Sequence, residues 1–403
     1  MISAIRDKTI AELKTVGNAE IVIGVPSYNC EETIGYVLEA AAFGLRKYYP
    51  NSKAVIFVSD GGSTDDTREK AFAADTGNIS KIVAIYRGAS GKGTAFRQVF
   101  EAAVFLGARG LAIFESARKS ITPEWVGNLL APVLDNSFDF VAPVYKRYKF
   151  DAAITSTIAY NLTRAIYGTD ISQPIGGDWA LSDGFVKFLL SQDVWSGDIT
   201  KYGVDIWMTT RAIVYNFRVA QARLGVKFHR EKKPNDLSTM FYQVVGTIFA
   251  MMDTDHDFWT NIKSVREPPI FGEYVGVEPP SFEVDKYALM DYFKNGFITF
   301  RSLWREILDD REYECLERLS LWENGTIELP IEIWVKIVYR YVWQYHKQER
   351  QRNKLLSTLI PLYSARVASL IDALSNDAID TTAYFEEQAK AFEKAKPELI
   401  AAW

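Results

Sequence analysis

Short apolar runs alternate with amphipathic segments over the first third of the chain. The apolar runs are rich in Val and Ile and are bounded by turn residues, which is typical of buried strands. The segments between them repeat apolar residues at helical spacing. Strands are therefore predicted at residues 21–28, 53–60, 81–87, 110–115 and 138–145.

Helices are predicted between these strands, at residues 30–49, 63–75 and 93–107. Ser63 or Thr64 is the expected N-cap of the second helix, because acidic residues follow in its first turn. Regular strand–helix alternation indicates an α/β fold with a mostly parallel sheet covered on both faces. Ligands bind such sheets at the carboxyl ends of the strands, where Asp60 and Glu115 fall.

Beyond residue 146 the pattern changes. A helical stretch at 150–168 is followed by loops, and strongly helical segments recur at 286–308, 329–350 and 382–403. A Pro- and Gly-rich stretch at 265–283 is the expected linker. The predicted organisation is an α/β domain at 1–264, the linker at 265–283 and a helical domain at 284–403.

Composition narrows the class of protein. The 403 residues include 48% hydrophobic and 24% charged residues, which is ordinary for a globular protein with a large core. A net charge of −5 argues against a nucleic-acid binder. Because apolar runs fall short of the roughly 18 residues of a membrane span and no signal core opens the chain, we expect a soluble cytoplasmic protein. Two distant cysteines, Cys30 and Cys315, suggest neither a disulfide framework nor a zinc site.

Two glycine-containing turns follow predicted strands. In "VSDGGSTDDT" (58–67), Asp60 precedes two glycines and a helix start. The glycines would let a ligand approach the backbone, but the same arrangement occurs in ordinary strand–turn–helix junctions. In "YRGASGKGTAFR" (86–97), glycines surround Lys92 ahead of a helix. Such a turn can cradle phosphates, although it is no Walker loop and an ordinary flexible turn would look similar.

Three further acids or bases stand out in loops. Asp178 lies in "QPIGGDW" (173–179) and Asp205 in "YGVDIWMTTRA" (202–212), each beside tight-turn glycines. N-capping is the structural alternative for Asp205. His229 follows a predicted strand in a charged loop, but a lone histidine is more often a surface or core residue than a ligand.

The stretch "LAIFESARKSITPEW" (111–125) poses a question of metal chemistry. A strand ending in a carboxylate, a small residue and a second carboxylate commonly holds a metal diphosphate. Here Glu115 and Ser116 are followed by Ala117, which can ligate nothing. The residues alone leave open a metal site with a missing ligand, a site that works without metal, or no site.

In their order, "VPSYNCEETI" (25–34), "VSDGGSTDDT", "GKGTA", Glu115 and "SITPEW" resemble the nucleotide-sugar glycosyltransferases of the GT-A fold. The later motifs "KRYKFDAAITST" (146–157), "QPIGGD", "YGVDIWMTT" and "KFHREKKPNDLSTM" are similar to the mannosylglycerate and glucosylglycerate synthases. The resemblance covers about residues 21–249. It implies a Rossmann-like catalytic domain followed by a helical C-terminal region.

The resemblance also implies an activity: retaining transfer of glucose or mannose from UDP-glucose or GDP-mannose to D-glycerate or a similar small hydroxy acid, in compatible-solute synthesis. It implies a divalent metal, Mg²⁺ or Mn²⁺, as cofactor. The C-terminal helices are a candidate interface for a homodimer. Position by position it implies donor contacts from Pro26, Tyr28, Asp60, Lys92, Ser116, Gly177 and Asp178. It implies catalytic positions at Asp205, Ile175 and Gly176, acceptor contacts from Arg147, Asp151 and Thr155, and metal ligands at Glu115 and His229.

Ala117 departs from the family pattern, which has an aspartate there. A site left with Glu115 and His229 should bind Mg²⁺ poorly. Arg118, Lys119 or Lys92 could then neutralise the diphosphate instead. A sugar-nucleotide sensor without turnover is the main alternative to the enzyme. A deliberate aspartate-to-alanine substitution in an active enzyme would also produce Ala117 at this position. A sugar-phosphate nucleotidyltransferase ranks lower, because the N-terminal glycine-rich loop of that class is absent.

Overall fold

The computed structural model describes residues 2–227, 234–273, 277–376 and 378–403. The chain forms two compact units, each built from several segments. Unit 1 comprises Met1–Arg147, Ile171–Glu231 and Glu267–Pro279. Unit 2 comprises Tyr148–Asp170, Lys232–Arg266 and Pro280–Trp403.

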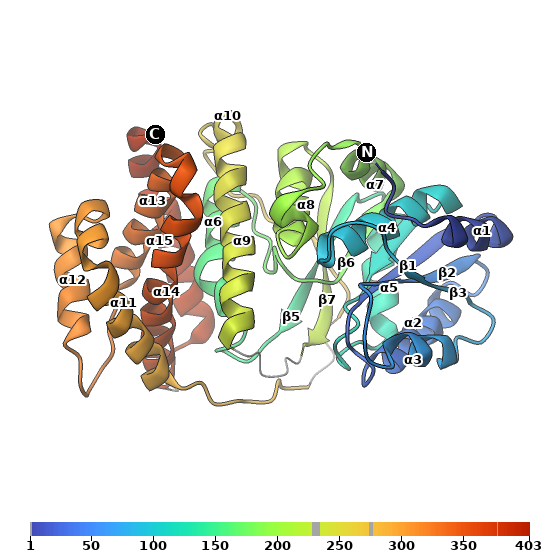
Figure 1. Cartoon of the computed structure of the whole chain (residues 1–403), viewed down its shortest axis with the longest axis horizontal. Coiled ribbons are helices and arrows are strands. Elements are labelled where there is room, and N and C mark those ends of the chain that lie inside the picture. Colours follow the sequence, from blue (N-terminus) through green and yellow to red (C-terminus); the bar gives the residue numbers. More distant parts are fainter. Residues whose placement is uncertain (1, 228–233, 274–276, 377) are drawn as a thin grey trace. The chain divides into compact units, whose positions relative to one another are not determined.

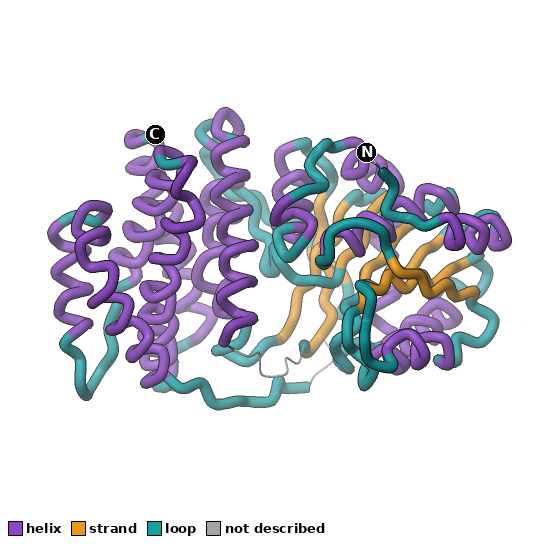
Figure 2. The backbone as a smooth tube through the Cα atoms, viewed as in Figure 1, coloured by secondary structure: helices purple, strands orange, loops and turns teal. Residues whose placement is uncertain are grey.

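Unit 1 contains one eight-stranded sheet with the order β3-β2-β1-β4-β6-β5-β7-β8 (Figures 1 and 2). Neighbouring strands are parallel except at β6, which runs antiparallel to β4 and β5. The mostly parallel α/β sheet predicted from the sequence is confirmed. The strands are β1 (Ile21–Ser27), β2 (Ala54–Asp60), β3 (Ser80–Ile85), β4 (Gly110–Ile113), β5 (Phe140–Lys146), β6 (Trp179–Ser182), β7 (Val219–Val226) and β8 (Ile270–Phe271).

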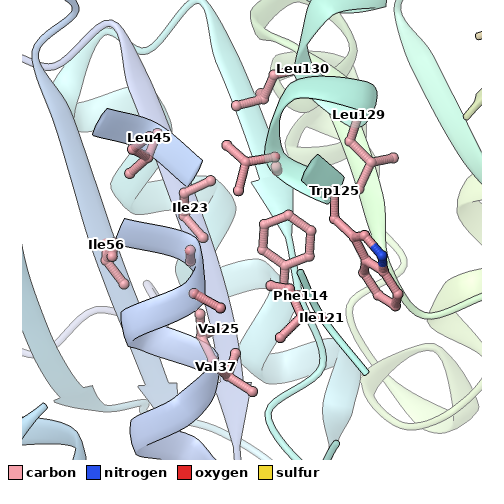
Figure 3. Packing of buried hydrophobic residues seen from close by; sticks show 14 of the residues in the cluster. Ile23, Val25, Val37, Leu45, Ile56, Phe114, Ile121, Trp125, Leu129 and Leu130 are labelled. Atoms are coloured by element: carbon pink, nitrogen blue, oxygen red, sulfur yellow. The ribbon is translucent and has the colours of Figure 1, made fainter. Parts of the chain in front are cut away.

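Helices cover both faces of the sheet because its central strands are apolar on both faces. Ile23 and Val25 of β1 pack with residues of α2 and α5 in one hydrophobic cluster (Figure 3). On the other face, Gly24 leaves room for Val99 of α4, whose side chain would lie 2.3 Å from an added Cβ. The helices of unit 1 are α1 (Asp7–Val16), α2 (Ile34–Tyr48), α3 (Thr67–Ala73), α4 (Lys92–Leu106), α5 (Pro123–Leu134), α7 (Asp183–Ser191) and α8 (Val204–Val214), with a 3₁₀ turn η2 (Gly197–Thr200).

The predicted capping of α3 by Ser63 or Thr64 is wrong. The helix begins later, at Thr67, and its N-cap position is Asp66, which makes no side-chain capping bond. Ser63 instead donates its hydroxyl to the Asp60 carboxylate at 2.6 Å. The polar residues that follow Asp60 form a loop hydrogen-bonded to the Asp60 carboxylate, and the helix begins only after them.

Unit 2 consists of helices and loops (Figure 2). Its buried centre includes large aromatic side chains such as Trp304, Trp334 and Tyr341. The predicted C-terminal helices are confirmed. The elements are η1, a π-helical turn (Thr155–Ala159), α6 (Tyr160–Tyr167), α9 (Pro234–Thr254), α10 (His256–Trp259), α11 (Lys286–Ile307), α12 (Asp310–Ser320), α13 (Ile331–Lys347), η3 (Glu349–Gln351), α14 (Arg352–Leu374) and α15 (Thr381–Ala402).

One stretch of the described chain, Glu349–Leu374, is long and apolar enough to cross a membrane. In its most apolar window 83% of the residues are buried inside the protein. That burial is the behaviour of a core helix.

The units do not follow the predicted domain limits at 264 and 284. Within the expected linker, β8 pairs with β7 in the sheet of unit 1. The early segment that contains α6 belongs to unit 2, where Arg164 is ion-paired with Glu386 and Glu393 of α15. The Arg164 ion pairs join residues more than 200 positions apart, so local composition gave no sign of them.

Candidate active site

Several predicted site residues lie at one edge of the sheet. Strands β2, β1 and β4 are parallel neighbours, so their carboxyl ends meet there. The antiparallel β6 starts at the same edge, because Trp179 pairs with Ile113 at the end of β4. Glu115 and Asp178 are brought together in this way: the Glu115 amide donates to Asp178 Oδ1 at 2.8 Å.

The Glu115 carboxylate is surrounded by three cationic side chains. Its Oε1 lies 2.9 Å from Lys92 Nζ, at the start of α4. Its Oε2 lies 3.1 Å from Arg118 Nε and 3.1 Å from Lys227 Nζ, just after β7. Sequence reasoning singled out Glu115 and Lys92 but missed Lys227, although its place after a strand end is where site residues of such sheets occur.

Lys227 is held by oxygens on several sides. Its ammonium donates to Asp178 Oδ2 at 2.6 Å, to the Gly176 carbonyl at 2.7 Å and to the Tyr145 hydroxyl at 3.2 Å. Tyr145 also donates a short hydrogen bond to Asp178. Because the Lys227 side chain is only 1% exposed, this ammonium is part of the protein interior.

A second carboxylate holds the other side of Lys92. Asp205 Oδ2 accepts from Lys92 Nζ at 2.7 Å, and Asp205 Oδ1 accepts from the Trp179 indole at 2.9 Å. The alternative that Asp205 caps its helix is wrong, since the N-cap of α8 is Gly203 and Asp205 lies inside the first turn.

Burial and opposite charges set the pKa values of this cluster. Burial raises the pKa of Glu115, but the charges of Lys227, Lys92 and Arg118 outweigh it and hold that pKa well below its usual range. Burial lowers the pKa of Lys92, yet two carboxylates hold it above its ordinary value. For Asp205 and Lys227 burial prevails, so the pKa of Asp205 is raised and that of Lys227 is lowered.

The predicted turn at Ile175, Gly176 and Gly177 lies against this cluster. Gly177 has φ +90°, and a Cβ there would fall 2.4 Å from Glu115 Oε1. A Cβ on Gly176 would fall 2.3 Å from Pro143. Both glycines are therefore required by close packing, and Gly177 makes room for the Glu115 carboxylate. Ile175 is partly exposed beside them.

Asp60 is engaged by its own loop. Its side chain is fully buried, and Oδ1 accepts from the amides of Gly62 and Ser63 at 2.9 and 2.8 Å. Its Oδ2 accepts from the hydroxyls of Ser27 and Ser63. In this structure Asp60 shapes the loop, and its predicted contact with a base or ribose stays a prediction.

Of the remaining donor positions, Tyr28 is 60% exposed and Pro26 is partly exposed. The Ser116 hydroxyl faces inward, where it donates to the Pro26 carbonyl at 2.7 Å and accepts from the Cys30 thiol. Ala117 and Lys119 are exposed.

The glycine-rich turn before α4 has a packing role. The Gly91 amide donates to the Tyr86 hydroxyl at 3.0 Å. A Cβ on Gly93 would fall 1.8 Å from the Ile199 carbonyl of η2. This close approach explains the glycine without a ligand, so the phosphate cradle stays a prediction.

The acceptor positions divide between the units. Arg147 ends a segment of unit 1; its guanidinium lies over the Tyr145 ring, 4.8 Å from the centroid, and its Nε donates to Gln173. Asp151 and Thr155 belong to unit 2, where Thr155 is buried at the start of η1. His229 lies outside the described residues.

The described part of the site does not fit a divalent metal. Ala117 supplies no oxygen, and both Glu115 oxygens are taken by cations, which would repel a metal ion. Within the described ranges no three His, Cys, Asp or Glu side chains are grouped so that they could hold a metal. Even a divalent cation held mainly by substrate phosphates and water needs one or two carboxylates that are available to it, and Glu115 is already ion-paired through both oxygens.

Comparison with known proteins bears on these observations. Residues 22–159 match the family described as Glycosyl transferase family 2. The glucosyl-3-phosphoglycerate synthase of Mycolicibacterium smegmatis is 27% identical over 259 residues, which cover 60% of this chain and 81% of the relative. The protein of the same name from Mycolicibacterium paratuberculosis is 28% identical over 268 residues, covering 60% and 75%.

Among solved structures, this chain is similar to a crystal structure of glucosyl-3-phosphoglycerate synthase from Mycobacterium tuberculosis in complex with Mn²⁺, uridine diphosphate and glucosyl-3-phosphoglycerate. The identity is 24%, the TM-score is 0.47, and the match covers 61% of this chain and 85% of that one. A divalent metal thus occurs among the similar proteins, as the resemblance implied. We conclude that this chain is a glycosyltransferase with the GT-A fold, similar to the glucosyl-3-phosphoglycerate synthases.

Proposed function

We propose that this protein transfers a hexose, glucose in the first instance, from a nucleoside diphosphate sugar to glycerate or its 3-phosphate with retention of the anomeric configuration. The observation that carries the proposal is the joining of Lys92, Glu115 and Asp205 at the ligand-binding edge of a glycosyltransferase sheet. The names of the two curated relatives support glucose as the sugar and a glycerate as the acceptor. GDP-mannose as donor is the alternative to UDP-glucose.

The geometry suggests a role for each group. Lys92, at the start of α4, is a charged donor for the diphosphate, and the amino end of the helix adds a favourable potential for anions. Asp205 positions the Lys92 ammonium and lies where the transferred sugar would be. The turn at Ile175–Gly177 borders the reacting carbon, and Arg147 has the planar fork that suits an acceptor carboxylate. Asp151 and Thr155 belong to unit 2, and their predicted acceptor contacts stay a prediction.

The test is a matrix of donors and acceptors. UDP-glucose and GDP-mannose are each incubated with D-glycerate or 3-phosphoglycerate, with EDTA and separately with Mn²⁺, and released nucleoside diphosphate is measured. Acceptor-dependent release of UDP is expected, and proton NMR of the product should show an α-linked glucose. Release that does not depend on either acceptor, or a β-linked product, would contradict the proposal.

A binding protein without turnover is the second candidate, and the Ala117 departure favours it. It predicts that UDP-glucose binds but that no diphosphate is released under any metal condition. Calorimetry and the release assay on the same preparation separate the two functions. We also propose that the reaction takes place in the cytoplasm, and light scattering would test the expected homodimer.

A further inference from the structure

The Lys227 ammonium has the surroundings of a bound cation. Oxygens of Asp178, Gly176, Tyr145 and Glu115 lie 2.6 to 3.2 Å from its Nζ. They come from β5, from the turn before β6 and from the loop after β4, so one side chain connects three parts of the site. The Lys227 side chain is only 1% exposed, so these contacts are made inside the protein.

Among the described residues, the ion pairs of the cluster join equal numbers of cations and carboxylates. Three cations, Lys92, Arg118 and Lys227, face three carboxylates, Glu115, Asp178 and Asp205. A site with two strand-end carboxylates and a histidine would carry excess negative charge that a divalent ion must neutralise before a diphosphate can approach. Here Ala117 removes one carboxylate and Lys227 neutralises the remaining one.

We propose that Lys227, held between Glu115 and Asp178, is a resident cation that takes the place of a divalent metal, so that the donor diphosphate binds without metal. This inference rests on the proposed function, because it needs a nucleoside diphosphate as ligand. Lys227 is a positioning residue: it holds Glu115 and the glycine turn in place. Lys92 and Arg118 are the cations that meet the phosphates, since their side chains are 12% and 17% exposed.

The electrostatic reason is general. Leaving-group stabilisation requires positive charge fixed near the phosphates in a site of low dielectric, and an ammonium or guanidinium can supply it as well as a metal. Because Lys227 remains ion-paired with Glu115 Oε2, the Glu115 carboxylate competes less strongly with a phosphate for Lys92 and Arg118.

The test is calorimetric titration of UDP into the full chain, first with EDTA and then with Mn²⁺. The dissociation constant is expected to change by less than about twofold between the two conditions. Binding that requires Mn²⁺ would overturn this inference but leave the proposed function standing. Binding under neither condition would overturn the proposed function in its UDP-glucose form.

The Lys227→Met variant gives a second readout. Removing the ammonium frees the carboxylates of Glu115 and Asp178, so UDP binding in EDTA should weaken by about tenfold or more, and Mn²⁺ should partly restore it. A merely structural role for Lys227 would not explain UDP binding that Mn²⁺ restores in the variant but leaves unchanged in the parent. Equal UDP affinity in the variant and the parent, or a loss without rescue, would contradict the proposal.

A matched control is Lys187→Met on α7. Lys187 is exposed and pairs with Asp183, away from the cluster, so its removal should leave UDP binding unchanged. Should Lys227→Met fail to fold by circular dichroism, the EDTA and Mn²⁺ comparison on the parent protein still decides the question.

Discussion

The Lys92 ammonium lies 2.7 Å from the Asp205 carboxylate, although the two residues are 113 positions apart in the sequence. One stands at the start of α4 and the other in the first turn of α8. Because both side chains are largely buried, each depends on the other for its charge to be tolerated.

This pair leads to the first prediction. Lys92→Met would leave Asp205 without its cation and reduce the neutralisation of Glu115, so the free energy of unfolding should fall by about 3–5 kcal/mol. The measurement is a urea titration followed by circular dichroism. Lys187→Met, an exposed lysine of the same unit, should change stability by less than about 0.5 kcal/mol. An unchanged urea midpoint for Lys92→Met would show that the pair contributes nothing.

A second prediction concerns Gly177. Alanine there must adopt φ +90° and place its Cβ 2.4 Å from Glu115 Oε1, so Gly177→Ala should cost roughly 1–2 kcal/mol of stability and displace the carboxylate from its cations. Donor affinity should fall as well. Gly184→Ala is the control: Gly184 lies in α7, and its added Cβ would meet nothing nearer than 3.8 Å. That change should be neutral or stabilising by up to about 1 kcal/mol. Equal effects of the two changes in thermal melts and UDP titrations would refute the argument.

A third prediction restores the carboxylate that the family pattern contains. Ala117 is exposed, so Ala117→Asp should fold normally. The added negative charge should weaken UDP binding in EDTA by about tenfold, and Mn²⁺ should recover it, because two carboxylates then flank the site. Ala117→Asn, of the same shape without the charge, should stay close to the parent. Metal-indifferent binding in the aspartate variant would count against a metal position at residue 117.

A fourth prediction concerns pH and unit 2. Burial lowers the pKa of Lys396 in α15 from 10.5 to about 8. Its ammonium donates to the carbonyls of Ile166 and Ile262. Between these two pKa values the unfolded chain keeps the lysine proton and the folded chain has lost it. Stability therefore rises with pH across that window, by at most about 1.4 kcal/mol per unit.

The measurement compares the parent with Lys396→Met in urea titrations at pH 7, 8, 9 and 10. The difference in unfolding free energy should move in favour of the parent as pH rises from 8 to 10. A difference that is constant with pH would mean that Lys396 keeps an ordinary pKa in the folded state.

Local sequence patterns identified most of the sheet. The strands that end at Ser27 and Asp60 are largely apolar runs and are buried, so composition and spacing were enough to predict them. The strand that ends at Ile85 was also predicted, although it lies at the edge of the sheet and is only half-buried. The start of the helix after Asp60 was harder to predict, because serine, threonine and aspartate side chains can either cap a helix or hydrogen-bond within a loop. Only the observed hydrogen bonds show that Ser63 binds Asp60.

The short strand at Ile270–Phe271 was missed for a different reason. It lies in a Pro- and Gly-rich stretch and has only two residues, so its pairing with β7 owes nothing to local propensity. Likewise, the segment with Arg164 joins the C-terminal helices through ion pairs that no window of the sequence contains.

By itself, the sequence determined that this chain has a mostly parallel α/β sheet with Glu115 and Asp60 at strand ends, because side-chain periodicity is a local property. It also determined that Ala117 interrupts the expected metal motif. Only the tertiary structure decided which cations lie against the carboxylate that remains, Glu115. Lys227 contacts Glu115 and Asp178 because separate strands end at one edge of the sheet. Its ammonium is buried, and therefore depends on these carboxylates, only once the chain has folded.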